Sequence, residues 1–197
     1  MEDARQNTVH THLQRSVRTF SATEKECVPT ILRAAESIAE SFKNGGKLLI
    51  CGNGGSAADS QHMAAEFVSR LRIDRPRAAL SAIALTTDTS FLTAYSNDEG
   101  YEGVFARQVE AHGKKGDVLL GITTSGTSKN ILRAFEEAKK KGVVTIALTG
   151  SKGLKTDADC VIAVPGEDQQ CTQEAHLAVE HIICELVEDA LFPQKHG

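Results

Sequence analysis

The segment LLICGNGGS, residues 48–56, decides the fold class of this 197-residue chain. Its first four residues form a short apolar run, which is typical of a strand buried on both faces. The glycine-rich turn that follows opens a helical pattern over about Ala57 to Arg70. The segment DVLLGITTSGTSKN, residues 117–130, repeats this arrangement, and the helix after it runs through Lys141. Buried strands that alternate with helices predict a parallel sheet covered by helices on both faces.

The rest of the chain continues the same alternation and supplies about five strands in all. We therefore predict an α/β fold with three layers and a central parallel sheet. The remaining predicted strands cover Ala82 to Leu85, Val143 to Leu148 and Val161 to Val164, and the remaining predicted helices cover Ser90 to Ala94, Val104 to Ala111 and a final stretch through His176 and Ala190 that stops before Pro193.

Residues 1–45 form a polar arm ahead of the α/β domain of residues 46–197. One apolar stripe runs from Val9 to Phe20 at helical spacing, and a second runs from Ile31 to Phe42, with its start expected near Pro29. Two helices are therefore expected before the first strand. Such an arm either folds back on its own core or packs against another subunit, and the pattern leaves both open.

Charge and composition exclude several classes of protein. The chain carries 26 acidic and 22 basic side chains, a net charge of −4, which argues against electrostatic binding of nucleic acid. Its 41% of hydrophobic residues suffices for one sizeable core. Neither a membrane span nor a signal peptide is visible, so we expect a cytoplasmic protein. The five cysteines are scattered without a CxxC pair, which favours reduced thiols.

Both turns that follow buried strands are candidate phosphate sites. Free N–H groups at a helix start favour an anion, glycine lets the backbone approach it, and hydroxyls can bond its oxygens. The alternative is that Ser and Thr only cap the helices. The turns lack a GK[ST] ending and a GxGxxG spacing, so a small phosphorylated metabolite fits better than a nucleotide. The hydroxyls that can bond phosphate oxygens are those of Ser56, Thr124, Ser125 and Ser128.

A second set of residues has the chemistry of a metal or acid–base site. His62 and Glu66 stand at i and i+4 on the helix that leaves the first turn, so they share one face. Gln173 and His181 lie eight residues apart near the C-terminus, about 12 Å along a regular helix, a spacing that a second subunit would relax. The alternative in both places is a solvated polar helix face.

In order along the chain, GNGGSAADSQHMAAEF, ALTTDTSFLTAYSNDEGYE, GDVLLGITTSGTSKNIL and TQEAHLAVEHIICELVE resemble the sugar isomerase (SIS) family over nearly the whole length. The resemblance implies a flavodoxin-like three-layer sandwich and a homotetramer whose active sites form where subunits meet. It implies one zinc ion per subunit, bound by His62, Glu66, Gln173 and His181. It also implies that Gln173 contacts the substrate. The sugar contacts that it implies are Asn53, Gly54, Gly55, Asn97 and Asp98, and the phosphate contacts are Ser56, Thr123, Thr124, Ser125 and Ser128.

The implied reaction is isomerisation of a ketose to an aldose, sedoheptulose 7-phosphate to D-glycero-D-manno-heptose 7-phosphate, for the heptose of lipopolysaccharide. Glu66 is expected to act as the base and His181 as the complementary acid/base. The sequence departs from the family pattern at Thr123, often Ser, and at Cys171-Thr172, usually a basic and an aliphatic residue. Thr123 keeps the hydroxyl, whereas a Cys171 thiolate could compete for zinc.

Two other functions remain to be weighed. One is a non-catalytic regulator of the same family that associates with the bacterial replication initiator. That regulator lacks the acidic residue at position 66 and the histidine at position 181, and this chain has both. The other is a sugar-phosphate sensor attached to a DNA-binding domain, and the first 45 residues show no basic recognition helix. We therefore expect neither a nucleic-acid nor a membrane partner.

Overall fold

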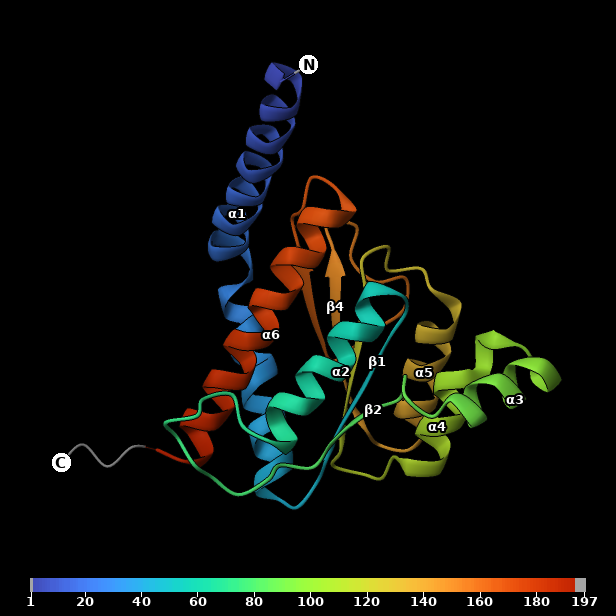
Figure 1. Cartoon of the computed structure of the whole chain (residues 1–197). Helices are drawn as coiled ribbons and strands as arrows, with labels where there is room; N and C mark the ends of the chain where they lie inside the picture. Colours follow the sequence, from blue (N-terminus) through green and yellow to red (C-terminus); the bar gives the residue numbers. More distant parts are fainter. Residues whose placement is uncertain (1, 194–197) are drawn as a thin grey trace.

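A computed structural model describes residues 2–193 and shows a five-stranded, fully parallel sheet in the order β2-β1-β3-β4-β5. This confirms the predicted α/β fold (Figure 1). The burial pattern of the central strands is continuous because helices cover both faces. The strands are β1 Leu48–Gly52, β2 Ala82–Ala84, β3 Val118–Thr123, β4 Val144–Gly150 and β5 Cys160–Val164.

The helices divide between the two faces of the sheet and create two apolar cores. Helices α1, α2 and α6 pack on one face against side chains such as Ile50, Leu120 and Leu148. Helices α4 and α5 pack on the other face against Leu49 and Leu119. The helices are α1 Glu2–Lys43, α2 Gly55–Val68, α3 Thr89–Glu99, α4 Val104–His112, α5 Lys129–Lys140 and α6 Gln169–Leu191, with a single 3₁₀ turn at Tyr101–Gly103.

The expectation of two N-terminal helices is wrong, because α1 is one continuous helix of 42 residues with Pro29 inside it. Proline deprives the helix of only one N–H, at one turn. The face that includes Cys27, Ile31 and Ile38 is buried on both sides of that position, and this packing outweighs the local loss. The N-terminal half of α1 then continues past the rest of the fold (Figure 1).

Two further sequence-based expectations concern thiols and membranes. All five cysteines are buried and free of disulfides within the described residues, which confirms the prediction of reduced thiols. Among residues 2–193, no helix combines the length and the apolar character needed to cross a bilayer, α1 included.

Candidate active site

A cavity of about 330 Å³ opens at the carboxyl ends of β1 and β3. The strand order reverses between these two neighbours, which is the point where open parallel sheets bind their ligands. Both turns singled out in the sequence meet here, together with two residues of α6. The cavity is lined by Asn53, Gly54, Gly55, Ser56, Ile122, Thr123, Thr124, Ser125, Ser128, Gln169 and Gln173.

The starts of α2 and α5 leave their polar groups available to a ligand. Among the described residues, no side chain caps α2 after Gly54, and the Ser128 hydroxyl at the start of α5 makes no capping bond. Instead, Ser128 Oγ lies 3.2 Å from Thr123 Oγ1, which in turn lies 3.4 Å from Ser125 Oγ. This cluster of hydroxyls at two helix N-termini is suited to phosphate oxygens.

Charge complementarity in this cavity comes from dipoles rather than from basic side chains. Within the described part of the chain, its lining contains neither lysine nor arginine. Lys152 and Lys155 instead line an adjoining hollow of about 560 Å³, which shares Thr124, Ser125 and Gln169 with the cavity. Helix starts therefore supply the positive potential nearest a bound anion.

The Asn53 side chain is fixed by two residues that the sequence reasoning missed. Asn130 Nδ2 donates to Asn53 Oδ1 at 2.8 Å, and Asn53 Nδ2 donates to Asn130 Oδ1 at 3.0 Å. Tyr101 Oη donates to the same Asn53 oxygen at 3.1 Å. Asn130 stands in the first turn of α5, directly after the second candidate turn. That position in the sequence is the signal that would have identified it as a residue of the site. Gln169, also missed, lies in the first turn of α6.

His62, Glu66 and His181 converge between α2 and α6. His62 Nε2 lies 2.8 Å from His181 Nε2, with the two rings edge to face, and 3.7 Å from Glu66 Oε1. The His62 side chain is 42% exposed and that of Glu66 is 20% exposed, so the group is open to solvent. Two imidazoles and one carboxylate at this spacing can exchange protons or bind a metal ion.

Gln173 belongs to a different contact between the same two helices. Its Nε2 lies 2.5 Å from the position that a Cβ on Gly55 would occupy, so the glycine makes room for it. His62 and His181 follow these two residues by seven and eight positions, about 10 to 12 Å of helix rise. Within one chain, therefore, three of the four predicted zinc ligands come together and Gln173 stays at the cavity.

The donor set of the His62 group fits a zinc ion. Two imidazole nitrogens and a carboxylate oxygen are the ligands that catalytic zinc takes. In the structure the two ring nitrogens face each other at 2.8 Å, so they would have to separate to roughly 3.3 Å to bind one zinc ion. A different group, His12, Cys171 and Glu174, also offers three potential metal ligands, all within 4.8 Å of one another.

Asn97 and Asp98 lie away from the cavity of their own chain. Both are exposed at the end of α3, where Asn97 Nδ2 donates to Asp98 Oδ1 at 2.8 Å. Neither is among the residues that line the cavity described above. Their contact with substrate therefore stays a prediction.

Two ionisable side chains of α6, Glu180 and His176, are fully buried. Burial, followed by the nearby Asp59 carboxylate, raises the pKa of Glu180 to about 9, and both of its oxygens lack a partner among the described residues. Burial lowers the pKa of His176 to about 4, although its Nε2–H donates to the Thr149 carbonyl oxygen at 3.0 Å. At neutral pH both groups are therefore uncharged.

Comparison with known proteins defines the class first. Residues 11–150 match the family model described as "SIS domain", so the chain belongs to the SIS domain family. It is 54% identical to the phosphoheptose isomerase of Roseiflexus sp. over 168 residues, 84% of each chain. It is 47% identical to that of Aneurinibacillus thermoaerophilus over 191 residues, 95% of this chain and 96% of the relative.

A solved structure agrees with these relatives. The phosphoheptose isomerase of Neisseria gonorrhoeae superposes with a TM-score of 0.85 at 41% identity, over 93% of this chain and 98% of that one. Within the SIS domain family the chain therefore belongs to the phosphoheptose isomerases, a group of aldose–ketose isomerases.

Proposed function

We propose that the protein interconverts sedoheptulose 7-phosphate and D-glycero-D-manno-heptose 7-phosphate, the step that supplies heptose for lipopolysaccharide. The family relationship supports the reaction. The observation that carries the proposal is the meeting of Glu66, His62 and His181 on the helices that leave the hydroxyl-lined cavity. A site with a carboxylate, imidazoles and a phosphate cradle has the groups that an aldose–ketose isomerisation requires.

Each group of residues has a separate role in this reaction. The two turns bind the phosphate, and Asn53, held by Asn130 and Tyr101, bonds the sugar. The Glu66 carboxylate takes the proton from C1 of the ketose, and the electron pair of the C–H bond forms the enediol. Return of that proton at C2 completes the aldose. His181 gives a proton to the C2 oxygen and takes one from the C1 oxygen, so protons balance over the cycle.

We further propose zinc as the metal of this site, with His62, Glu66 and His181 as ligands from one chain. When bound, the ion supplies positive charge that polarises the sugar carbonyl and lowers the energy of the enediolate. Gln173 completes the set only if another copy or a helix shift brings it closer, since it contacts Gly55 in this structure.

The homotetramer is the proposed assembly, with residues 1–45 in its interfaces. The stripe of Val9, Leu13, Val17 and Phe20 on α1 is 42 to 63% exposed, which is unusual for an apolar helix face. Between α1 and α6 it continues into a groove of about 280 Å³ lined mainly by apolar side chains, including Leu32 and Ile182. A second copy would bury this stripe and bring Asn97 and Asp98 to a neighbouring cavity.

The test is conversion of sedoheptulose 7-phosphate by purified, zinc-loaded protein. Glu66→Gln and His181→Gln should each lower kcat by about 10²-fold or more, because each removes a proton-transfer group. Glu185→Gln, an exposed change on α6, is the matched control and should retain full activity. Near-normal activity in either variant removes that residue from the mechanism. No conversion by the zinc-loaded parent chain would favour the non-catalytic regulator.

A further inference from the structure

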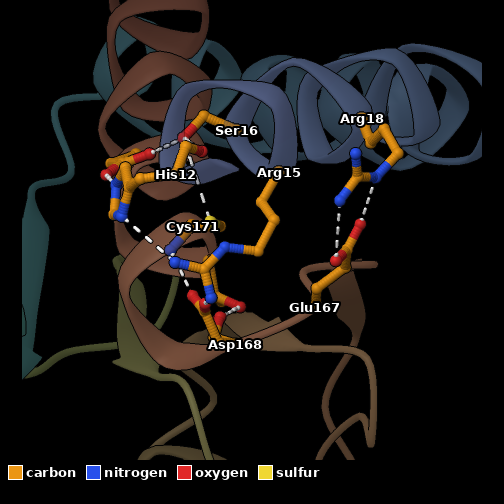
Figure 2. Close-up of polar contacts among 9 residues, drawn as sticks. His12, Arg15, Ser16, Arg18, Glu167, Asp168 and Cys171 are labelled. Atoms are coloured by element: carbon orange, nitrogen blue, oxygen red, sulfur yellow. Dashed lines mark hydrogen bonds and ion pairs between the residues drawn. The ribbon is translucent and has the colours of Figure 1, made fainter. Parts of the chain in front are cut away.

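A second cluster of metal-type side chains joins the N-terminal half of α1 to the first turn of α6 (Figure 2). His12 Nε2 lies 2.7 Å from Glu174 Oε1, and Ser16 Oγ donates to Glu174 Oε2 at 2.6 Å. The Cys171 thiol is buried beneath them, 3.8 Å from Ser16 Oγ. One nitrogen, one sulfur and one oxygen ligand atom thus lie within 4.8 Å of one another.

We propose that His12, Cys171 and Glu174 form a second metal site, for a borderline-soft divalent cation such as Zn²⁺. Thiolate, imidazole and carboxylate are all ligands that zinc accepts, whereas Mg²⁺ and Ca²⁺ prefer oxygen alone. A thiolate and a carboxylate together carry the two negative charges that balance such an ion. On binding, the Cys171 S–H bond breaks, its proton leaves to solvent and the sulfur binds the metal, with no change of oxidation state.

An ion would require the Cys171 sulfur, now within 4.8 Å of the other two ligand atoms, to lie about 3.5 Å from each. With ordinary zinc–ligand bond lengths, neighbouring ligand atoms of a tetrahedral site lie roughly 3.3 to 3.6 Å apart. His12 Nε2 and Glu174 Oε1, now 2.7 Å apart, therefore separate by roughly 0.6 Å to reach the lower value. Their side chains are 34% and 39% exposed, so both can move and an ion can enter from solvent.

Ser16 and Arg15, which contact the ligands, do not oppose binding of the ion. Ser16 orients the Glu174 carboxylate through its second oxygen, which leaves the first oxygen for the metal. Arg15 Nη2 makes a long contact of 3.4 Å with His12 Nδ1, and this contact is lost when Nδ1 carries the proton. The Arg15 charge stays neutralised because its guanidinium pairs with Asp168 at 2.6 Å.

This site is separate from the candidate active site. Cys171 and Gln173 stand two residues apart on α6 and therefore point to different sides of the helix. The thiol faces Ser16 of α1, whereas the amide faces Gly55 of α2. The thiol is therefore not placed to compete for the zinc of the His62 group. An ion at Cys171 would instead fasten α1 to the turn of α6 that carries Gln173.

Cobalt(II) absorption distinguishes the two sites in the full-length protein. A cobalt–thiolate bond gives a sulfur-to-metal charge-transfer band in the near ultraviolet, and the His62 group contains no thiolate. We expect the band to appear on titration of the metal-free chain with Co²⁺ and to disappear in Cys171→Ser. In Cys160→Ser the band should persist, because serine keeps the bond that Cys160 donates to the Thr30 carbonyl oxygen.

Two variants at residues other than the cysteine, the part-exposed His12 and the buried Ser16, keep the test independent of Cys171. His12→Gln should weaken cobalt binding at this band by about tenfold or more, and Ser16→Ala by about tenfold through the carboxylate it orients. His181→Gln should leave the band unchanged, so failure of the proposed isomerase activity would not affect this result. The proposal is overturned if no band forms at excess Co²⁺, or if the band survives in Cys171→Ser.

Discussion

Gln173 packs against Gly55, where the start of α2 approaches α6. A methyl group on Gly55 would meet the Gln173 amide at 2.5 Å, so this amide is held against the start of α2. The spacing of His62 and Glu66 predicted a shared helix face, and they lie 3.7 Å apart. The approach of His181 to His62 was not predictable from spacing, because it depends on how α6 packs against α2.

At the residue scale, the buried His176 should lower the free energy of unfolding as the pH becomes acidic. Its pKa falls from 6.5 to about 4 on folding, mainly through burial, so the folded chain binds this proton less readily than the unfolded chain. This stabilisation is complete above pH 6.5 and is lost as the pH falls toward 4. At pH 5 the loss should be about 2 kcal/mol.

The measurement is urea unfolding at pH 7.5 and at pH 5 for the parent chain and for His176→Gln. Glu180, with its raised pKa, acts in the opposite direction in both proteins. Because glutamine does not titrate, we expect the change in stability from pH 7.5 to pH 5 to be more favourable in the variant than in the parent. His112→Gln, a change of an exposed histidine, should follow the parent curve. Equal losses in the His176→Gln variant and the parent would show that another group causes the acid sensitivity.

At the element scale, the hydrophobic pattern predicts which segments form helices and strands, whereas tertiary contacts determine where those elements end. The continuous α1 shows this clearly, since Pro29 suggested a helix start and the buried face of Ile31 and Ile38 overrode it. The segment between α2 and β2 shows it as well. Arg77 donates to the carbonyl oxygens of Glu66 and Phe67, which have no donor within the helix because α2 ends there. No local sequence pattern predicts these contacts of Arg77.

Arg77 therefore connects α2 to α6, and its replacement should destabilise the fold. Its guanidinium pairs with Glu188 at 2.5 Å, and 3% of each side chain is exposed. Arg77→Met should lower the free energy of unfolding by about 3 to 5 kcal/mol, because it leaves a buried, unpaired carboxylate. The measurement is the midpoint of urea unfolding at neutral pH.

The double variant Arg77→Met, Glu188→Leu separates charge from packing. Removal of both charges should recover part of the loss, since an apolar pair needs no charge partner. Recovery should remain incomplete, because Leu71 N–H loses its Glu188 acceptor and the Glu66 carbonyl oxygen loses the Arg77 donor. A double variant as unstable as the single one would contradict an electrostatic cause.

At the scale of the whole molecule, the sequence predicted the sheet and both turns but left the fate of the N-terminal arm open. Its stripe from Val9 to Phe20 has the right periodicity for a buried face, and within one chain that face remains exposed. Periodicity reports that a face needs a partner and carries no information on which chain supplies it. The proposed assembly would explain in the same way why Gln173 lies apart from His62, and why Asn97 and Asp98 do not line the cavity of their own chain.

Assembly is therefore the prediction to test at this scale. Light scattering coupled to size exclusion should give the mass of four chains for the parent. Phe20→Glu should lower that mass, since it places a charge in the apolar groove between α1 and α6. Ile73→Glu, a change at an apolar side chain that is 86% exposed and outside the groove, is the control and should leave the mass unchanged. A parent that runs as one chain would contradict the proposed tetramer.

The long reach of α1 also has a consequence for dosage. If copies must associate to complete the site, the number of complete sites rises more than in proportion to chain concentration, as long as that concentration is near or below the dissociation constant of the assembly. In that range dilution would lower the activity per chain, and a modest rise in expression would raise it. The exposed stripe on α1 would in this way make output a steep function of abundance.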